Sequence, residues 1–317
     1  MLRQGLLSGC LSGCVLAFAV AALSVGAQTT SANEWTWTGG SSQRNPSAVY
    51  GILQTPAAAN TPGGRSGAVR WATPDGGIWV FGGSGVDSTG HDGTFSDLWE
   101  LNPATGEWTW MAGPDKTEQS GVYGSLGAAA AGNSPGARSA AVSWTDSKGS
   151  LWLFGGEGFD SAGKIGYLND LWLFNPSSKE WTWMGGSNTL PTCPSTNSCG
   201  PQGVYGTLGT ASSVNVPGGR AGAVGWTDST GNFWLLGGRV YVVYLNGWTG
   251  YLNDLWKFNP TTSQWTWMGG SSTVTGLAGA PGIYGTLQTP GTENVPGSRQ
   301  GSVSWTDSTG NLWLLCV

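Results

Sequence analysis

The sequence predicts an all-β fold that is built from tandem copies of one four-stranded antiparallel unit. Repetition is the first observation, because the tripeptide Trp-Thr-Trp occurs four times at near-regular spacing, at residues 35–37, 108–110, 181–183 and 265–267. Composition is the second, since 55 Gly and 20 Trp among 317 residues, together with short apolar runs, are typical of short strands joined by tight turns. The third observation is that no helical periodicity occurs outside the N-terminal segment.

Residues 1–27 have the three-part pattern of a secretory signal peptide. Arg3 is their only charged side chain, residues 11–25 are apolar or small, and the small residues at 25–27 suit a cleavage site. We therefore expect an exported protein (secreted, periplasmic or on the cell surface) whose folded domain spans residues 28–317. The alternative is an uncleaved N-terminal anchor, because the uncharged stretch nearly reaches membrane-spanning length.

The cysteines agree with export. Cys10 and Cys14 lie in the signal segment, where each ends a Leu-Ser-Gly-Cys sequence that resembles a bacterial lipobox, so lipidation is a further alternative. Cys193 and Cys199 flank a short polar loop, and we expect them to form a local disulfide in an oxidising compartment. Cys316 then has no predicted disulfide partner. A zinc site is disfavoured, because it needs two more ligands and the chain has a single His.

The first strand of each unit begins at an arginine and ends at a tryptophan. A turn of the type Thr-Asp-Ser-x-Gly follows three of the four copies, in which Asp and Ser can bond the turn backbone and Gly accepts a positive φ. The turn predicts a hairpin to the second strand. The four segments are 65–71, 138–144, 220–226 and 299–305.

The other three strands also recur. The second is an apolar run that suits a strand covered on both faces. It ends in Gly-Gly, at Gly82 and Gly83, Gly155 and Gly156, and Gly237 and Gly238. The third begins with Asp-Leu-Trp and ends at Asn-Pro, since proline cannot continue a central ladder. The fourth is Trp-Thr-Trp, whose two indoles share one face of the strand; we expect the strand tryptophans to fill the core between units.

Four-stranded sheets repeated in tandem are typical of a β-propeller, in which each sheet is one blade. Complete blades are expected at 65–111, 138–184 and 220–268. A lone strand at 34–38 precedes them and a partial blade at 299–317 follows, so three full blades plus a partial blade make an incomplete ring. We interpret the chain as the front part of a longer propeller, with the missing blades in the rest of a longer chain.

The repeat resembles the Kelch repeat. The matching features are the Gly-Gly pairs, a bulky apolar residue in the third strand and a Trp seven residues later, at Leu101 and Trp108, Phe174 and Trp181, and Phe258 and Trp265. The resemblance implies a Kelch-type β-propeller in which these Gly and Trp residues are structural. One departure is the apolar residue in the third strand, where the family usually has Tyr.

A long insert before the next arginine is the second departure from the Kelch pattern. Each insert keeps its own motif of Val or Ile followed by Tyr-Gly, which predicts a structured loop. The tyrosines are equally suited to fixing their loop and to contacting a ligand. They are Tyr50, Tyr123, Tyr205 and Tyr284.

The candidate contact surface is the rim that carries the long loops. Topology places the loops between strands two and three at the same rim as the inserts, and function is concentrated on loops held by a rigid scaffold. The third of these loops is the most unusual, because it holds Tyr241, Tyr244 and Trp248. The arginines that begin the strands lie at this rim too, where they either hold an anionic ligand or form bridges to Asp97, Asp170 and Asp254. They are Arg65, Arg138, Arg220 and Arg299.

Composition and motifs favour a binding or scaffolding module that is not an enzyme. The net charge of −5 lacks the basic cluster that nucleic acid requires. Kelch-like propellers include galactose oxidase, whose copper needs His and Tyr ligands, and His91 is the single His here, so we expect no metal and no cofactor. The expected partner is a protein or a surface glycan. The alternative function is a fragment of a secreted carbohydrate-active or galactose-oxidase-like enzyme.

Overall fold

The computed structural model describes residues 36–317 apart from 74–75, 193–198, 243–247, 275–278 and 316–317. The chain divides into two units, Met1–Trp37 and Thr38–Val317, and every strand of the described residues belongs to the second. All regular elements of the described residues are strands, and they pair antiparallel, so the all-β prediction is confirmed. No helix in this described part is long and apolar enough to cross a membrane.

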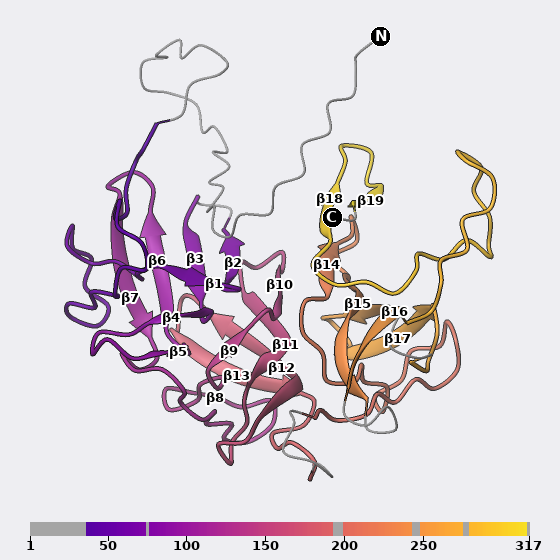
Figure 1. Cartoon of the computed structure of the whole chain (residues 1–317), viewed down its shortest axis with the longest axis horizontal. Coiled ribbons are helices and arrows are strands. Elements are labelled where there is room, and N and C mark those ends of the chain that lie inside the picture. The colour runs from indigo at the N-terminus through magenta and orange to yellow at the C-terminus, as the bar shows by residue number, and fades with distance from the viewer. Residues whose placement is uncertain (1–35, 74–75, 193–198, 243–247, 275–278, 316–317) are drawn as a thin grey trace. The chain divides into compact units, whose positions relative to one another are not determined.

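Three sheets of sequential antiparallel strands follow one another along the chain (Figure 1). The first contains β2 (Val69–Ala72), β3 (Ile78–Phe81), β6 (Leu98–Asn102) and β7 (Glu107–Ala112). The second contains β10 (Val142–Thr145), β11 (Leu151–Phe159), β12 (Ile165–Asn175) and β13 (Glu180–Gly185). The third contains β14 (Val224–Thr227), β15 (Phe233–Val242), β16 (Trp248–Asn259) and β17 (Gln264–Gly269).

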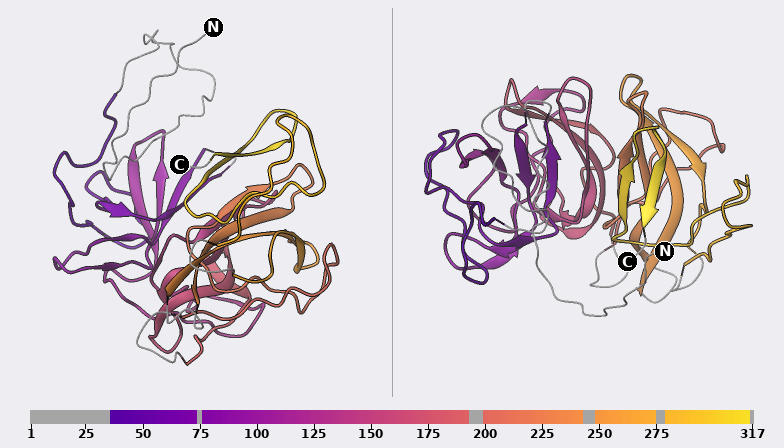
Figure 2. Two further views of the ribbon diagram at one scale, coloured as in Figure 1. Left: turned by 45° about the vertical axis from the view of Figure 1, so that its right-hand side comes forward. Right: turned by 90° about the horizontal axis from the view of Figure 1, so that it is seen from above.

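A two-stranded hairpin continues the series after the third sheet. It consists of β18 (Val303–Thr306) and β19 (Leu312–Leu315), drawn in yellow beside the orange third sheet (Figure 2). Trp226 Nε1 of the third sheet donates to the carbonyl oxygen of Trp313 in β19 at 3.3 Å, which ties the two together. At the other end, residues 36–38 of the predicted strand 34–38 form no strand, and Glu34 and Trp35 lie outside the described residues.

The first strand of each sheet begins later than the sequence pattern suggested. The predicted start was the arginine, but a residue with positive φ two positions later turns the chain and interrupts the strand. In the first sheet the short strand β1 (Arg65–Ser66) therefore pairs with β4 (Ser84–Val86), which also pairs with β5 (Asp92–Thr94). In the second, β9 (Arg138–Ser139) pairs with the extended end of β11.

The Gly-Gly pair lets the backbone of one sheet approach and hydrogen-bond the backbone of the following unit. Gly82 has φ +66°, and a Cβ there would lie 2.6 Å from the carbonyl oxygen of Arg138 in the following unit. The N–H of Gly83 donates to that same oxygen at 2.9 Å. Only glycine combines this backbone shape with this approach. The same bond recurs from Gly156 to Arg220 and from Gly238 to Arg299.

The core lies between adjacent sheets and is largely aromatic. Trp71 Nε1 of the first sheet donates to the carbonyl oxygen of Trp152 in the second at 3.0 Å, and Trp144 Nε1 repeats the bond to Trp234 at 3.1 Å. Trp79 packs against Phe174 of the next sheet with 5.5 Å between ring centroids. Trp71 and Trp144 therefore contribute buried apolar area and also have a partner for the indole N–H.

The inserts pair with the outer strand of each sheet, as a short strand in the second sheet and as a single bridge in the first and third. β8 (Ala129–Ala130) pairs with β13, and single bridges join Ala57 to Trp108 and Ser212 to Trp265. In each case the insert belongs to the connection that precedes the sheet. The outer Trp-Thr-Trp strand is thus covered rather than left as an exposed edge, which protects it from pairing with another chain.

Candidate functional site

The candidate rim arginines are structural in all three complete sheets. Arg138 forms a bidentate pair with Asp170, with Nη1–Oδ1 at 2.6 Å and Nη2–Oδ2 at 2.7 Å, and 1% of its side chain is exposed. Arg220 pairs with Asp254 in the same way, and Arg65 with Asp97. The bridge that sequence analysis offered as an alternative is therefore the observed arrangement. A buried, fully paired guanidinium is not available to an anionic ligand.

Arg299 begins the fourth repeat and is half-buried. Its Nε donates to the carbonyl oxygen of Gly297 at 2.7 Å, and its carbonyl accepts the N–H of Gly238. Arg138 and Arg220 make the matching bonds, so Arg299 occupies the same structural position as these two arginines.

Each buried aspartate accepts two further hydrogen bonds. Oδ2 of Asp170 accepts the hydroxyl of Tyr123 and Nε1 of Trp172, both at 2.7 Å. Burial, followed by the charge of Asp170, raises the pKa of Tyr123 well above its usual range, so the hydroxyl stays a donor. The insert tyrosine therefore fixes its loop onto the sheet. Equivalent bonds join Tyr50 and Trp99 to Asp97, and Tyr205 and Trp256 to Asp254.

Carboxylates also fix the tips of the first two hairpins, where the second and third strands meet. Oδ1 of Asp160 accepts the N–H groups of Ala162 and Lys164, each at 2.8 Å, which closes the turn. Oδ2 accepts the N–H of Leu190 from the connection after the fourth strand at 2.7 Å. Asp87 does the same in the first sheet, with Thr117 as the distant partner. These bonds place the hairpins and the inserts at one rim, as the topology predicted.

The third hairpin departs from this plan. Gly158, Phe159 and Asp160 of the second sheet correspond to Val240, Tyr241 and Val242 when the Gly-Gly pairs are superposed in sequence. We expected Tyr241, Tyr244 and Trp248 in a loop. Instead Tyr241 lies in β15, Trp248 begins β16, and Tyr244 lies outside the described residues. Valine and tyrosine favour extended backbone, which explains the longer strands.

A cavity of about 410 Å³ opens beside this third hairpin, which we call the third-hairpin pocket. The insert contributes Gln202, Tyr205 and several glycines, and the hairpin contributes Val240 and Tyr241. Ser272 and Thr273, from the connection after β17, complete the wall. Hydroxyl, amide and backbone groups share the lining with the apolar side chains of Pro201, Leu252 and Val274. Arg220, the one charged residue of the lining, is neutralised by Asp254.

Val240 lines this pocket and stands where the second sheet has Gly158. At the matching Gly158, a Cβ would collide with the carbonyl oxygen of Ala137, because the insert runs directly against the hairpin. There Arg138 pairs with Gly158 in a two-residue ladder. The third sheet keeps a single bridge, between Ala221 and Arg239. The pocket thus opens between the insert and the hairpin in the sheet where valine replaces this glycine.

An ion pair spans the second and third sheets close to this pocket. Arg239 Nη2 lies 2.6 Å from Glu157 Oε2, with 32% and 31% of the two side chains exposed. The guanidinium of Arg239 also lies 5.8 Å from the ring centroid of Tyr167. Because the pair is partly solvated it contributes little stability, roughly 0–1 kcal/mol. Its main effect is to fix the edge of the hairpin next to Val240.

The described residues contain no group of three or more His, Cys, Asp or Glu that could hold a metal ion. His91 Nδ1 lies 3.1 Å from the hydroxyl of Thr117, in the tip of the first hairpin. Cys199 is in a disulfide, and its predicted partner Cys193 lies outside the described residues, so that pairing stays a prediction.

Two features were missed by sequence reasoning. No structural role was predicted for the tip aspartates Asp87 and Asp160, although their spacing after Gly-Gly is the same. The replacement of Gly158 by Val240 is visible in the aligned repeats, and it marks the position where the pocket opens. Both signals become interpretable once the hairpin register is known.

Comparison with known proteins identifies the repeat. A family model described as the Kelch motif matches residues 65–115. A search of the curated proteins finds no match. Among solved structures, one of YjhT is similar, with 17% identity and a TM-score of 0.45; the match covers 79% of this chain, which spans 59% of that one.

Proposed function

We propose that this chain, which belongs to the Kelch-repeat β-propeller family, is an exported binding module that holds a partner protein at the third-hairpin pocket. Kelch repeats generally mediate interactions between proteins, and the blades supply a rigid frame for variable rim loops. We propose export from the signal-like pattern of residues 1–27.

The observation that carries the proposal is the pocket itself. Two of the three hairpin rims are closed by glycine packing and by carboxylates, whereas the third is open over about 410 Å³. Its wall offers backbone groups of glycines, the amide of Gln202, the ring of Tyr241 and the hydroxyls of Ser272 and Thr273. Neutral hydrogen-bonding groups beside an aromatic ring suit a polypeptide segment with its own backbone donors and acceptors.

A glycan is the second candidate ligand, because a tyrosine ring and neutral hydroxyl and amide groups also suit a sugar. The two candidates separate in one experiment. The full chain is screened against a displayed peptide library and against a glycan array, each with the variant Tyr241→Ala in parallel. We expect peptide binding that Tyr241→Ala weakens about tenfold or more, as for an aromatic anchor in an interface.

Thr230→Ala is the matched control, since Thr230 lies in the turn at the opposite end of the same third sheet. Binding that the two variants change equally would argue against the pocket. Binding of sugars alone would favour the glycan. Secretion of the full-length chain, with N-terminal sequencing of the mature protein, tests export; retention of residues 1–27 in the mature protein would favour an anchor.

A further inference from the structure

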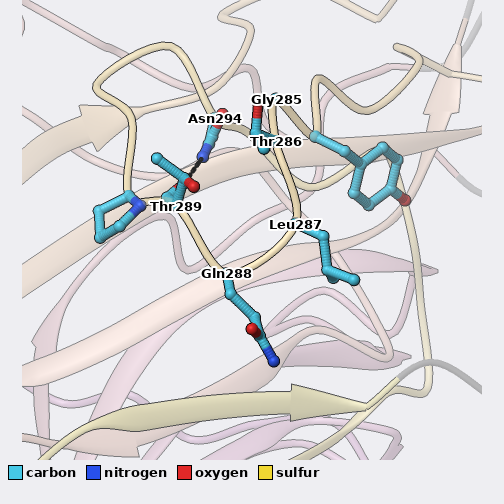
Figure 3. Close-up of a pocket in the computed structure, with 8 residues that line it drawn as sticks. Gly285, Thr286, Leu287, Gln288, Thr289 and Asn294 are labelled. Carbon is cyan, nitrogen blue, oxygen red and sulfur yellow. Dashed lines mark hydrogen bonds between the residues drawn. The ribbon is translucent and has the colours of Figure 1, made fainter.

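The four inserts share one internal framework of hydrogen bonds. In each, the N–H of the residue before the repeat arginine donates to the carbonyl oxygen of the residue four positions before the insert tyrosine. The asparagine ten residues after the tyrosine adds a bond within the insert, as Asn294 does to the carbonyl oxygen of Thr289 (Figure 3). The inserts are therefore built alike, and the first three can be compared by how each meets its hairpin. The backbone bonds run from Gly64 to Pro46, from Ala137 to Gln119, from Gly219 to Pro201 and from Ser298 to Ala280, at 2.8 to 2.9 Å.

The second insert is joined to its hairpin by two backbone hydrogen bonds. The N–H of Phe159 donates to the carbonyl oxygen of Ala137 at 2.9 Å, and the N–H of Gly121 donates to the carbonyl oxygen of Asp160 at 3.2 Å. Two consecutive hairpin residues thus supply one donor and one acceptor to the insert, as a neighbouring strand does in an antiparallel sheet. No side chain takes part in these two bonds, so the insert recognises the hairpin here by its main chain.

The third insert has the same two backbone groups without a bond to its hairpin. Gly203 and Gly219 correspond to Gly121 and Ala137 when the tyrosines and arginines of the repeats are aligned. Within the part of the chain that the structure describes, neither the N–H of Gly203 nor the carbonyl oxygen of Gly219 has a hydrogen-bond partner. Both glycines line the third-hairpin pocket, and Gly219 is buried. Because buried backbone groups are nearly always paired, this donor and acceptor mark a place for a ligand.

The first sheet, in its described residues, also lacks these two bonds, but it leaves no space at the insert carbonyl. A Cβ added to Gly85 of its hairpin would collide with the carbonyl oxygen of Gly64, as one on Gly158 would with that of Ala137. In the third sheet the corresponding hairpin residue is Val240, and a cavity of about 410 Å³ lies beside it. That volume is within the range of ligand pockets, about 300–1,000 Å³. The third sheet therefore combines an unbonded donor and acceptor with room for a guest.

We propose that the partner protein enters the third-hairpin pocket as a short extended segment, the guest strand, and pairs through its backbone with Gly203 and Gly219. The inference rests on the proposed function and specifies how that partner is bound. One N–H of the guest strand donates to the carbonyl oxygen of Gly219, and the carbonyl oxygen of its next residue accepts the N–H of Gly203. Phe159 and Asp160 make the same two bonds in the second sheet.

Binding by strand addition has a consequence for selectivity. Main-chain hydrogen bonds supply the affinity in this mode, and the pockets for alternate side chains supply the specificity. The ring of Tyr241 and the side chain of Leu252 line the pocket and offer surfaces for the side chains of the guest strand. Segments of different sequence are accepted if they are extended and have a free N–H at the residue that meets Gly219, which excludes proline there.

The probe is a synthetic peptide of residues 157–162 with blocked ends, which carries Phe159 and Asp160 in their own sequence. It is titrated into the full-length chain, and hydrogen exchange of single amides is followed by NMR. The amide of Gly203 should exchange more slowly in proportion to the fraction of chain bound. Gly121 is the internal control, because its N–H is already bonded to Asp160 and its exchange should not change. The same measurement is made with the peptides selected from the displayed library.

Two backbone-modified forms of the probe test the pairing from the guest's side. N-methylation of Phe159 removes the donor for Gly219 and should raise the Kd about tenfold. N-methylation of Gly158 is the matched control. Its N–H lies on the opposite edge of an extended segment, so the Kd should stay within about twofold.

Failure of this inference is distinguishable from failure of the proposed function. Peptides that bind and are weakened by Tyr241→Ala, yet leave the exchange of Gly203 unchanged, would overturn strand pairing and leave the proposed function standing. Equal effects of the two N-methyl groups would overturn strand pairing in the same way. Absence of binding by the probe and by every peptide of the displayed library would overturn both.

Discussion

The second and third sheets are alike through their strand order, their Gly-Gly pairs and their buried Arg–Asp pairs, and they differ at the hairpin tip. In the second sheet Gly158 lets the insert pack against the hairpin, and Asp160 ties the tip to Leu190. In the third sheet the sequence has Val240 and Val242 at these two positions, and a pocket of about 410 Å³ opens beside the hairpin. A constant interior thus carries a variable rim.

The largest loss of stability is expected at the buried Arg–Asp pairs, which the two sheets share. Replacing Asp170 or Asp254 by Ala leaves a buried guanidinium, a tyrosine hydroxyl and an indole N–H without their acceptor. Loss of one partner of a buried pair costs about 3–5 kcal/mol. We expect similar losses for both variants in urea unfolding. A much smaller loss in the free energy of unfolding for Asp254→Ala than for Asp170→Ala would show that the interior of the third sheet is also packed less tightly.

The variant Gly158→Val gives the closed hairpin of the second sheet the residue type that the open hairpin of the third sheet has at this position. Its side chain collides with the carbonyl oxygen of Ala137, so the insert must move away. Overpacking of this kind costs about 1–3 kcal/mol. Hydrogen exchange of Phe159, whose N–H donates to Ala137, should become faster.

The reverse change, Val240→Gly, is the partner variant in the same experiment. It should change stability by about 1 kcal/mol or less, because it removes one side chain from a half-buried strand. Ligand binding at the pocket should weaken as the insert settles against the hairpin. Unchanged protection of Phe159 in Gly158→Val would contradict the role assigned to this glycine.

Asp160→Asn tests the carboxylate at the closed tip. The amide can replace at most part of the three backbone bonds that Asp160 accepts, from Ala162, Lys164 and Leu190. We expect a loss of about 1–2 kcal/mol, with faster hydrogen exchange confined to this tip and to Leu190. The same change at Asp87 should act only on the first hairpin, and spreading of the effect to the core would contradict a local role.

The smallest effect is expected at the opposite end of the third sheet, where its turn matches that of the second. Burial disfavours the charge of Asp228, but hydrogen bonds from Trp234, Thr230 and Asn232 outweigh it and lower its pKa from 3.8 to about 2. A lowered folded-state pKa gives stability that is present above pH 4 and is lost as the pH falls toward 2. Solvent screening limits the loss to about 1 kcal/mol or less. Asp228→Asn should remove this part of the acid dependence in thermal unfolding.

The sequence was sufficient for much of the fold and for less of the site. Gly-Gly, Asn-Pro and Trp-Thr-Trp each mark a strand end or a strand, because their backbone demands are local. The pairing of Arg138 with Asp170 was one of two alternatives, since both side chains could be placed at one rim from strand order alone. The inserts' role as an outer strand was not predicted, because their bridge to Trp108 or Trp265 joins residues about fifty positions apart.

The third-hairpin pocket shows the limit most clearly. Tyr241 was selected for its unusual loop, and it does line the pocket, as does Val240, which replaces the glycine of the second sheet. The meaning of that replacement depends on how closely the insert approaches the hairpin at Gly158, a distance that no local pattern encodes. The arginines were candidates by position and chemistry, and burial in an ion pair removed Arg65, Arg138 and Arg220 from that role.

The bond between each insert tyrosine and its buried aspartate has a consequence for how the molecule resists cleavage. The inserts are rich in Gly, Ala and Ser, a composition common in protease-sensitive linkers. Releasing one of them exposes a carboxylate that has lost a donor and an aromatic ring that has lost its neighbours. The first three inserts should therefore survive digestion until their whole sheet unfolds. Each insert is then part of the same cooperative unit as the sheet that it covers.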